Sequence, residues 1–596
     1  MYRMILALGL FAGLSMSSAA FSADDFDQFC RDHFGAAHEP LTTHLPGDDL
    51  KLLPDGQWSH VSEQSATLAF ESSLPMVSHI EYGPTPALGS KTPPTERAFY
   101  LHIHRLTALE PGTTYHYKLV GADERGRTIE SAVATISPKK IAGAIHLPSA
   151  DQPAPPFNLD RADATYVLTQ DIIADATAVN LLAPNITLDL NGYTITYNNV
   201  SGATSNDDQT QRTFGFLATQ GAQGVRSAYA TRGSGRLVNG TIRQGAGGGG
   251  YGSVPVLFRG SEIAGMTIEY HGPQVSGIDN EARHVHHNIL LDRGSELTNR
   301  HQGVQAIGGA TQVNHNLVKR ARHRAINGVS NAKIHRNELY VDSCTTNSFG
   351  VMLYKTTRCE VTDNRIFGRG YLMIGIGTVS EGVGESTIAR NFIHVQSHRP
   401  DDRWAEYGAQ SGAYGVRVTW GGKDIEYVDN VIVSKGRDGG MVRGIWFCPT
   451  PNSENVVFRR NLIKVLAETN DVTRWGAIVI SGDNSAESKR GVFVENTVWS
   501  NFCHVRLGEE YGAGMNARFV DNTFIRVGDD PRYATVICGY GNFNNEGTVF
   551  IDTKLEGGAS FDLVKWEGTG RNGFKVGRRE DGNDVIEREF RPGGAK

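Results

Sequence analysis

Asparagine recurs along the chain in front of short apolar segments. Nine copies lie between residues 288 and 522, and consecutive copies are 21 to 39 residues apart. That spacing is typical of one coil of a parallel β-solenoid, in which each coil contacts only its neighbours. We expect each asparagine to lie at a turn, with its amide bonded to the backbone or to the asparagine of the next coil. The copies are Asn288, Asn316, Asn337, Asn364, Asn391, Asn430, Asn461, Asn496 and Asn522.

A second repeat precedes the asparagine of most coils and consists of a small residue followed by an apolar one. Its copies are Gly277-Ile278, Gly303-Val304, Ala325-Ile326, Gly350-Val351, Gly415-Val416 and Gly444-Ile445. Because side chains alternate along a strand, we expect the apolar member to point into the core and the small member to point outward. A row of outward glycine would form a floor on which a ligand can approach the backbone closely.

The pattern changes toward the amino terminus. Residues 1–23 combine a basic start, an apolar middle and a small-residue end, which is typical of a secretory signal and predicts a secreted or periplasmic protein. No other apolar run reaches the roughly 20 residues that a membrane-spanning helix needs. After a segment at 24–56, residues 57–139 contain alternating strands separated by Gly and Pro turns.

Within residues 57–139, the stretch from Leu109 to Tyr117 resembles the tyrosine corner of fibronectin type III domains, in which a tyrosine hydroxyl bonds back to the preceding turn. The resemblance implies a small β-sandwich. We expect this sandwich to fold independently and to be dispensable for any chemistry, with the proline-rich residues 140–164 as a linker.

Residues 166–172 and 185–195 resemble the opening coils of right-handed parallel β-helix proteins of the pectin-lyase-like superfamily. Together with the asparagine repeat, this implies an all-β protein. A right-handed parallel β-helix at 165–550 would follow the sandwich, and 551–596 would form a carboxyl-terminal cap or tail. This fold hosts lyases, hydrolases, epimerases and adhesins, so the resemblance implies a polysaccharide-active protein without selecting a reaction.

The charge and the cysteine content argue against several other classes of protein. The net charge of −6 over 596 residues argues against a nucleic-acid partner, which calls for a basic excess. Six cysteines are too sparse and too irregularly spaced for a disulfide scaffold or a zinc site. A divalent cation such as calcium stays an open question, because no ligand motif for one is evident.

Basic, amide and aromatic residues flank the small-apolar repeat. The two Arg-His pairs, at 300–301 and 322–323, are 22 residues apart, so we expect them to stack as neighbours in successive coils. Such groups along a groove suit an anionic sugar chain, since arginine binds carboxylate in a bidentate manner and rings stack on sugars. The candidate substrate-binding residues are Arg300, Arg322, Arg324, Gln305, Asn327, Arg417 and Trp446.

Elimination from a uronate needs a cation for the carboxylate, a base for the neighbouring C–H and an acid for the leaving oxygen. The candidates for base and acid are His301, His323, Lys355 and Tyr354. The sequence therefore favours a lyase acting on an acidic polysaccharide. A glycoside hydrolase needs two carboxylates, for which Asp279 and Glu281 are available. An epimerase and a non-catalytic carbohydrate-binding or adhesive solenoid remain as further alternatives.

Overall fold

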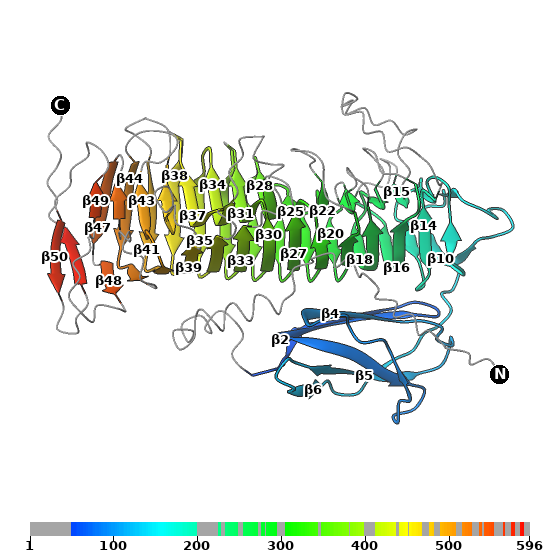
Figure 1. Cartoon of the computed structure of the whole chain (residues 1–596). Coiled ribbons are helices and arrows are strands. Elements are labelled where there is room, and N and C mark those ends of the chain that lie inside the picture. Colours follow the sequence, from blue (N-terminus) through cyan, green and yellow to red (C-terminus); the bar gives the residue numbers. More distant parts are fainter. Residues whose placement is uncertain are drawn as a thin grey trace, which may run out of the picture.

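A long stack of parallel strands carries a smaller antiparallel sheet along one side (Figure 1). This computed structural model describes residues 49–199, 224–227, 233–247, 254–271, 276–279, 282–294, 304–343, 347–380, 382–397, 412–436, 440–450, 452–467, 476–481, 489–507, 515–526, 536–538, 541–546, 548–552, 564–566, 574–578 and 584–588. The regular elements of these residues are β-strands. The prediction of an all-β parallel helix is confirmed by the strand pairing.

Each coil of the helix contributes one strand to each of three parallel sheets. We call the sheet that runs from β9 to β49 sheet 1, and its successive strands pair from one coil to the next. Its strands are β9 (Phe157–Leu159), β12 (Val179–Leu181), β15 (Val225–Ser227), β17 (Val256–Leu257), β19 (Ile278–Asp279), β22 (Gln305–Gly308), β25 (Arg324–Gly328), β28 (Ser348–Tyr354), β31 (Leu372–Val379), β34 (Gly412–Thr419), β37 (Met441–Cys448), β40 (Ile478–Ile480), β43 (Val505–Leu507), β46 (Val536–Cys538) and β49 (Val564–Trp566).

Sheets 2 and 3 follow sheet 1 in each coil, and β16 (Arg236–Gln244) and β18 (Glu262–Tyr270) run through both. The other strands of sheet 2 are β8 (Ile145–Leu147), β10 (Thr165–Leu168), β13 (Thr187–Asp189), β20 (His284–His286), β23 (Gln312–Asn314), β26 (Lys333–His335), β29 (Glu360–Thr362), β32 (Gly384–Ala389), β35 (Lys423–Val428), β38 (Glu454–Arg459), β41 (Lys489–Val494), β44 (Met515–Val520) and β47 (Gly541–Glu546). The other strands of sheet 3 are β11 (Ile172–Ile173), β14 (Thr194–Tyr197), β21 (Ile289–Asp292), β24 (Leu317–Ala321), β27 (Glu338–Ser343), β30 (Arg365–Gly370), β33 (Phe392–Ser397), β36 (Val431–Gly436), β39 (Leu462–Ala467), β42 (Thr497–Ser500), β45 (Thr523–Arg526) and β48 (Thr548–Asp552).

The asparagine repeat forms a continuous ladder at the turn between sheets 2 and 3, as predicted. The Nδ2 of Asn364 donates to Oδ1 of Asn391 at 2.9 Å, and Asn391 in turn donates to Asn430 at 2.9 Å. The same link joins all nine asparagines from Asn288 to Asn522. The residue before each asparagine is left-handed, for example Asp363 with φ of 58°. The turn therefore consists of a left-handed residue followed by the asparagine. The buried side-chain amides of the asparagines satisfy one another's hydrogen bonds.

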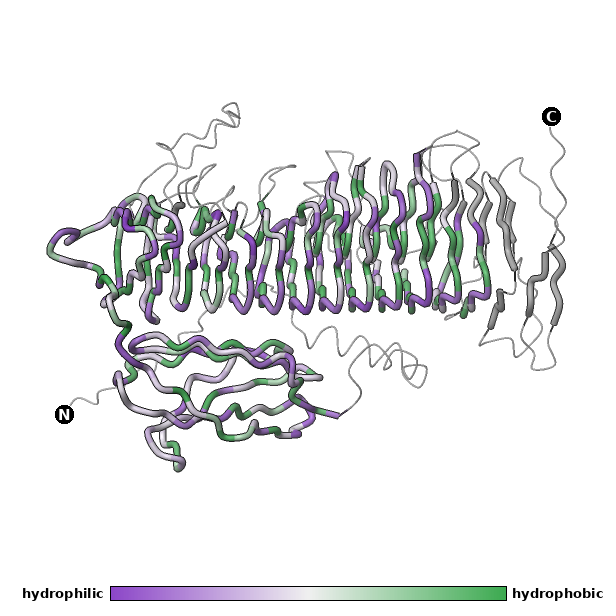
Figure 2. The backbone as a smooth tube through the Cα atoms, turned by 180° about the vertical axis from the view of Figure 1, so that it is seen from behind, coloured by the Kyte–Doolittle hydropathy of each residue, from purple (hydrophilic) through white to green (hydrophobic). Residues whose placement is uncertain are grey.

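The core is a stack of apolar residues in register, and its alternation along the coils is visible in Figure 2. Ile326, Val351, Val416 and Ile445 are fully buried and lie in one row, which confirms the predicted direction of the apolar member. The alignment was wrong in one coil. Ile326 pairs with Ile307, so Ile307 rather than the predicted Val304 occupies this row.

The small member of the repeat also faces the core, which contradicts the predicted outward floor. A Cβ placed on Gly415 would overlap Cγ2 of Ile432 in sheet 3, and Gly350 and Gly444 face isoleucines in the same way. The strand bends at this position. In the coil of Gly444, two successive amides, those of Gly444 and Ile445, donate to the carbonyl of Ala477 at 2.8 and 2.9 Å. Strict alternation therefore fails at the bend.

The amino-terminal sheet is antiparallel and consists of β1 (Leu52–Val61), β2 (Ala66–Gly83), β3 (Ser90–Lys91), β4 (Phe99–Leu106), β5 (Tyr115–Ala122), β6 (Thr128–Glu130) and β7 (Ala134–Ile136). The amide of Glu110 donates to the hydroxyl of Tyr115 at 3.0 Å, which is the contact expected of a tyrosine corner. Membership of the fibronectin type III family stays a prediction.

The borders of the helix differ from the predicted linker and tail. Residues 140–164 contain β8 and β9, and these strands pair in parallel with β10 and β12, so the helix begins inside the predicted linker. Within 551–596, β49 continues sheet 1. The strands β50 (Phe574–Arg578) and β51 (Asp584–Arg588) pair antiparallel, and β51 also pairs antiparallel with β48.

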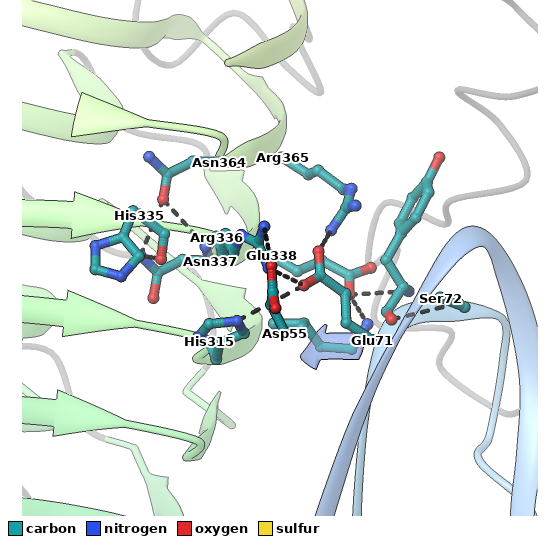
Figure 3. A network of polar contacts seen from close by, with 12 residues as sticks. Asp55, Glu71, Ser72, His315, His335, Arg336, Asn337, Glu338, Asn364 and Arg365 are labelled. Carbon is teal, nitrogen blue, oxygen red and sulfur yellow. Dashed lines mark hydrogen bonds and ion pairs between the residues drawn. The ribbon is translucent and has the colours of Figure 1, made fainter. Parts of the chain in front are cut away.

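The amino-terminal sheet packs directly on the outer face of sheet 3. Phe99, Tyr100 and Leu101 of β4 share one apolar cluster with residues that include Tyr340 and Phe367 of sheet 3. Polar groups of the amino-terminal sheet and of the helix also pair across the same interface (Figure 3). This extensive buried contact is at odds with the expectation of an independent module on a linker.

Candidate functional site: the outer face of sheet 1

Two rows of outward side chains run along sheet 1 from coil to coil. The outer row consists of Asp279, Gly308, Asn327, Met352, Gly377, Arg417 and Trp446. The upstream row, three residues earlier in each strand, consists of Gln305, Arg324, Phe349, Ile374, Tyr414 and Arg443. Neighbouring coils are about 4.8 Å apart, so the outer row extends over roughly 29 Å.

At one end of these rows, the structure brings together three of the predicted binding residues. Gln305 and Arg324 are partners in neighbouring strands, and Asn327 lies on the same strand as Arg324. Burial lowers the pKa of Arg324, because its guanidinium is partly removed from water. The Nε of Arg324 and the Oδ1 of Asn327 are buried and have no hydrogen-bond partner within the described part of the chain. Buried polar atoms of this kind are costly unless a ligand or water satisfies them.

At the other end, arginine side chains stack on aromatic rings. The fully buried Arg443 lies 4.9 Å from the ring centroid of Tyr414 and 4.5 Å from that of Trp446. Arg417 lies 4.8 Å from the Trp446 ring and donates to Oδ1 of Asn347 at 2.6 Å. The predicted residues Arg417 and Trp446 are therefore neighbours, and their contact with Tyr414 and Arg443 makes a rigid cationic and aromatic end of the outer face.

The predicted catalytic residues do not meet at one centre. His323 is 2% exposed and immediately precedes β25, level with the start of β28. Tyr354 ends β28 and Lys355 follows it. Seven residues of extended strand separate these levels, which is more than about 20 Å. The structure therefore does not bring His323 together with Tyr354 and Lys355. Arg300 and His301 lie outside the described residues.

Arg322 serves the interior of the protein rather than the outer face. Its Nε donates to Oδ2 of Asp292 at 2.7 Å, and the two side chains are 3% and 0% exposed. Burial raises the pKa of Asp292, and the charge of Arg322 opposes that rise. This buried ion pair accounts for the charge of Arg322, so the structure gives no support to its predicted role in substrate binding.

Carboxylates are scarce on this face. Asp279 is the single acidic residue in the strands of sheet 1 that the structure defines, whereas those strands carry six cations: Arg226, Arg324, Arg417, Arg443, Arg506 and Lys565. Asp279 accepts a 3.4 Å hydrogen bond from Gln305. Glu281, its predicted partner for hydrolysis, lies outside the described residues. The defined strands of sheet 1 thus do not supply the two carboxylates that glycoside hydrolysis requires.

Metal and thiol chemistry gain no support from the described residues. Within them, no group of three or more His, Cys, Asp or Glu side chains is arranged to hold a metal ion. Cys359, Cys448 and Cys503 are buried. The same residues contain no helix long and apolar enough to cross a membrane.

Two residues of this face were missed by the sequence analysis. Arg506 of β43 pairs with Val479 of β40, which places it in line with the outer row. The residue before Val505 is His504 rather than a small residue, so the small-apolar repeat did not mark Arg506. Trp420 follows β34 and is 51% exposed. No motif near Trp420 in the sequence predicts an exposed ring there, because its turn is held by a hydrogen bond to Cys448 of the next coil.

The chain is thus a parallel β-helix protein with an amino-terminal antiparallel sheet. No family model and no curated protein matches it. Among solved structures, it is similar to the family 28 exopolygalacturonase of Yersinia enterocolitica, with a TM-score of 0.21 and 11% identity over 87% of this chain and 100% of that one.

Two pectate lyases are similar at comparable levels. PelI from Erwinia chrysanthemi, solved in complex with tetragalacturonic acid, has a TM-score of 0.14 and 10% identity over 69% of this chain and 85% of that one. Pel3 from Pectobacterium carotovorum has a TM-score of 0.13 and 8% identity over 87% of this chain and 100% of that one. At these scores the three structures bear on neither the reaction nor the substrate, and the fold rests on the strand pairing.

Proposed function

We propose that the protein is an exported lyase that cleaves a uronate-containing polysaccharide on the outer face of sheet 1. The observation that carries this proposal is the composition of that face. Arginines, amides and aromatic rings follow one another along the two rows, and a single carboxylate accompanies them in the defined strands. An anionic sugar chain finds partners there for its carboxylates and its ring faces.

In such a reaction, a base removes the proton on the carbon next to the carboxylate. The bond between C4 and the glycosidic oxygen then breaks, a C4–C5 double bond forms, and the leaving oxygen is protonated. We assign binding of the carboxylate, and stabilisation of the charge that develops on it, to Arg324 and Asn327, whose buried polar atoms lack partners among the described residues. His323 directly precedes Arg324 and is the imidazole to test as the proton acceptor.

The test is incubation with polygalacturonate, alginate and chondroitin sulfate, followed by ultraviolet absorbance of the new double bond and by a reducing-end assay. A lyase produces both signals on at least one polymer. Reducing ends without absorbance would show hydrolysis, and binding without either signal would show a non-catalytic solenoid. Both results overturn the proposal.

Variants locate the reaction. Arg324→Ala should lower turnover by two or more orders of magnitude, since it leaves the carboxylate uncompensated. His323→Ala should lower it by a similar factor if this imidazole accepts the proton. The matched control is Arg358→Ala, which removes an exposed arginine that bonds Asn331 on the surface. Equal activity of Arg324→Ala and Arg358→Ala would exclude this face as the site.

A further inference from the structure

An open pocket of about 560 Å³ lies where successive strands of sheet 1 end. Lys355, Ser380, Trp420 and Thr450 line it. The first three immediately follow β28, β31 and β34, and their backbones are left-handed, with φ of 53°, 85° and 62°. The pocket is therefore built from equivalent turn positions of neighbouring coils. With coils about 4.8 Å apart, Lys355 and Trp420 are about 10 Å from each other.

Backbone hydrogen bonds between coils hold the turns that carry these side chains. The amide of Ser380 donates to the carbonyl of Thr419 at 2.9 Å, and the amide of Trp420 donates to that of Cys448 at 3.1 Å. The indole of Trp420 is 51% exposed, and the neighbouring Tyr354 is 47% exposed. A large exposed ring on a turn held by backbone hydrogen bonds is a ready surface for stacking, because the backbone needs little further ordering when a ligand binds.

The charge in the pocket is the ammonium of Lys355. Within the described residues, Lys355 makes no ion pair, and its Nζ lies 5.3 Å from the centroid of the Tyr354 ring. The equally exposed Lys333 and Lys423, by contrast, each pair with a glutamate of the next coil, at 3.2 and 3.3 Å. The pocket thus combines an exposed aromatic ring, an ammonium that makes no ion pair within the described residues, and the side chains of Ser380 and Thr450.

We propose that this pocket binds one acidic sugar unit of a polysaccharide. The indole of Trp420 stacks on the sugar ring, and the ammonium of Lys355 pairs with its carboxylate. This inference rests on the proposed function only for the class of ligand, because it assigns a separate contact that takes no part in bond cleavage. Trp420 lies three residues beyond Arg417 of the outer row, about 10 Å away, so one chain of a few sugar units can contact both.

The experiment measures binding of the full chain to polygalacturonate, alginate and chondroitin sulfate, with dextran as the neutral polymer, by calorimetry and by tryptophan fluorescence. Trp420→Ala should weaken binding of the preferred acidic polymer about tenfold, and Trp420→Phe should restore part of it, since a ring remains. Lys355→Ala should weaken the same binding about tenfold. The matched controls are Lys333→Ala and Ile173→Ala, which remove an exposed lysine and an exposed apolar side chain elsewhere.

The fluorescence change on binding should be smaller in Trp420→Phe than in the parent protein, because the indole that stacks on the sugar in the pocket has been removed. Acidic polymer bound equally well by Trp420→Ala, Lys355→Ala and the controls would overturn the pocket, and so would a parent protein that binds no acidic polymer or binds dextran as tightly. Turnover distinguishes the two proposals. Weaker binding in these variants without any unsaturated product would support the pocket and refute the lyase, and unsaturated product with unaffected binding would do the reverse.

Discussion

The buried carboxylate of Glu71 is the charge on which docking of the amino-terminal sheet depends (Figure 3). It projects from β2 toward basic side chains of three successive coils of the helix. Its Oε1 accepts a hydrogen bond from Arg365 at 2.8 Å. Its Oε2 lies 3.5 Å from Nη1 of Arg336 and 3.6 Å from Nε2 of His315. Glu71→Gln keeps the size of this side chain and removes its charge.

The magnitude follows from the pKa of Glu71. Burial alone would raise this pKa, but the charge of Arg365 and the contacts with His315 and Arg365 lower it from 4.5 to about 2. A difference of about 2.5 units corresponds to about 3 kcal/mol. Because the folded-state pKa is depressed, this stability is fully present above pH 4.5 and is lost as the pH falls from 4.5 toward 2. At neutral pH, Glu71→Gln should cost about 3 kcal/mol, since it leaves the buried Arg365 without its counter-charge.

Hydrogen exchange at the amides of Tyr100 and Leu101 measures this cost. Both amides donate to Glu338 of the helix, at 3.0 and 2.8 Å, so their exchange reports separation of the two parts. In Glu71→Gln their exchange should accelerate by about two orders of magnitude. The control is Asp363→Asn, which breaks a surface pair with an arginine at 2.7 Å and should cost less than about 1 kcal/mol. Equal exchange rates in the two variants would refute the reasoning.

Two further predictions concern buried polar groups. Asn391→Ala removes four bonds of the ladder, to Asn364, Asn430 and a carbonyl, and should destabilise the helix by about 3 kcal/mol. A denaturation midpoint no lower than that of the exposed variant Asn455→Ala would contradict this. Burial lowers the pKa of His102 from 6.5 to about 3, so its stability is present above pH 6.5 and is lost as the pH falls toward 3. His102→Gln should therefore flatten the fall in thermal midpoint between pH 6.5 and 4, and an unchanged slope would refute this.

The sequence was sufficient where each coil repeats the same local chemistry. The asparagine ladder was predictable because an amide that bonds its own copy must recur at every coil, and Asn364 and Asn391 do so. The direction of Gly415 was not predictable, because a bend in the strand interrupts the alternation on which the prediction rested. The pairing of Glu71 with Arg365 was also invisible. These residues are 294 positions apart, and each resembles an ordinary surface charge until both sheets exist.

The candidate site likewise contains some features that the sequence predicted and others that it did not. Gln305 and Arg324 were expected on opposite sides of the small-apolar repeat, whereas the register of β22 and β25 makes them direct partners. His323 and Lys355 were grouped because both flank the same repeat. The length of β28 separates them, and strand length is not fixed by the small-apolar motif. The substrate-binding role predicted for Arg322 lacks support for a different reason. Its partner Asp292 belongs to the preceding coil and is buried with it.

The three faces of the helix differ in how their charged side chains are paired, and this difference favours sheet 1 as the binding face. On sheet 3 the amino-terminal sheet covers an apolar cluster that includes Tyr340 and Phe367. Charges on the same sheet are paired, as Arg365 is with Glu71 and Arg369 with Asp342. Sheet 2 opposes charges of unlike sign in successive coils, as in the pairs of Lys333 with Glu360 and of Lys423 with Glu454, which is typical of a solvated face. On sheet 1 the defined strands gather arginines with one carboxylate. Bringing like charges together is costly for a fold alone, and this cost is the reason for proposing that an anionic ligand binds on this face.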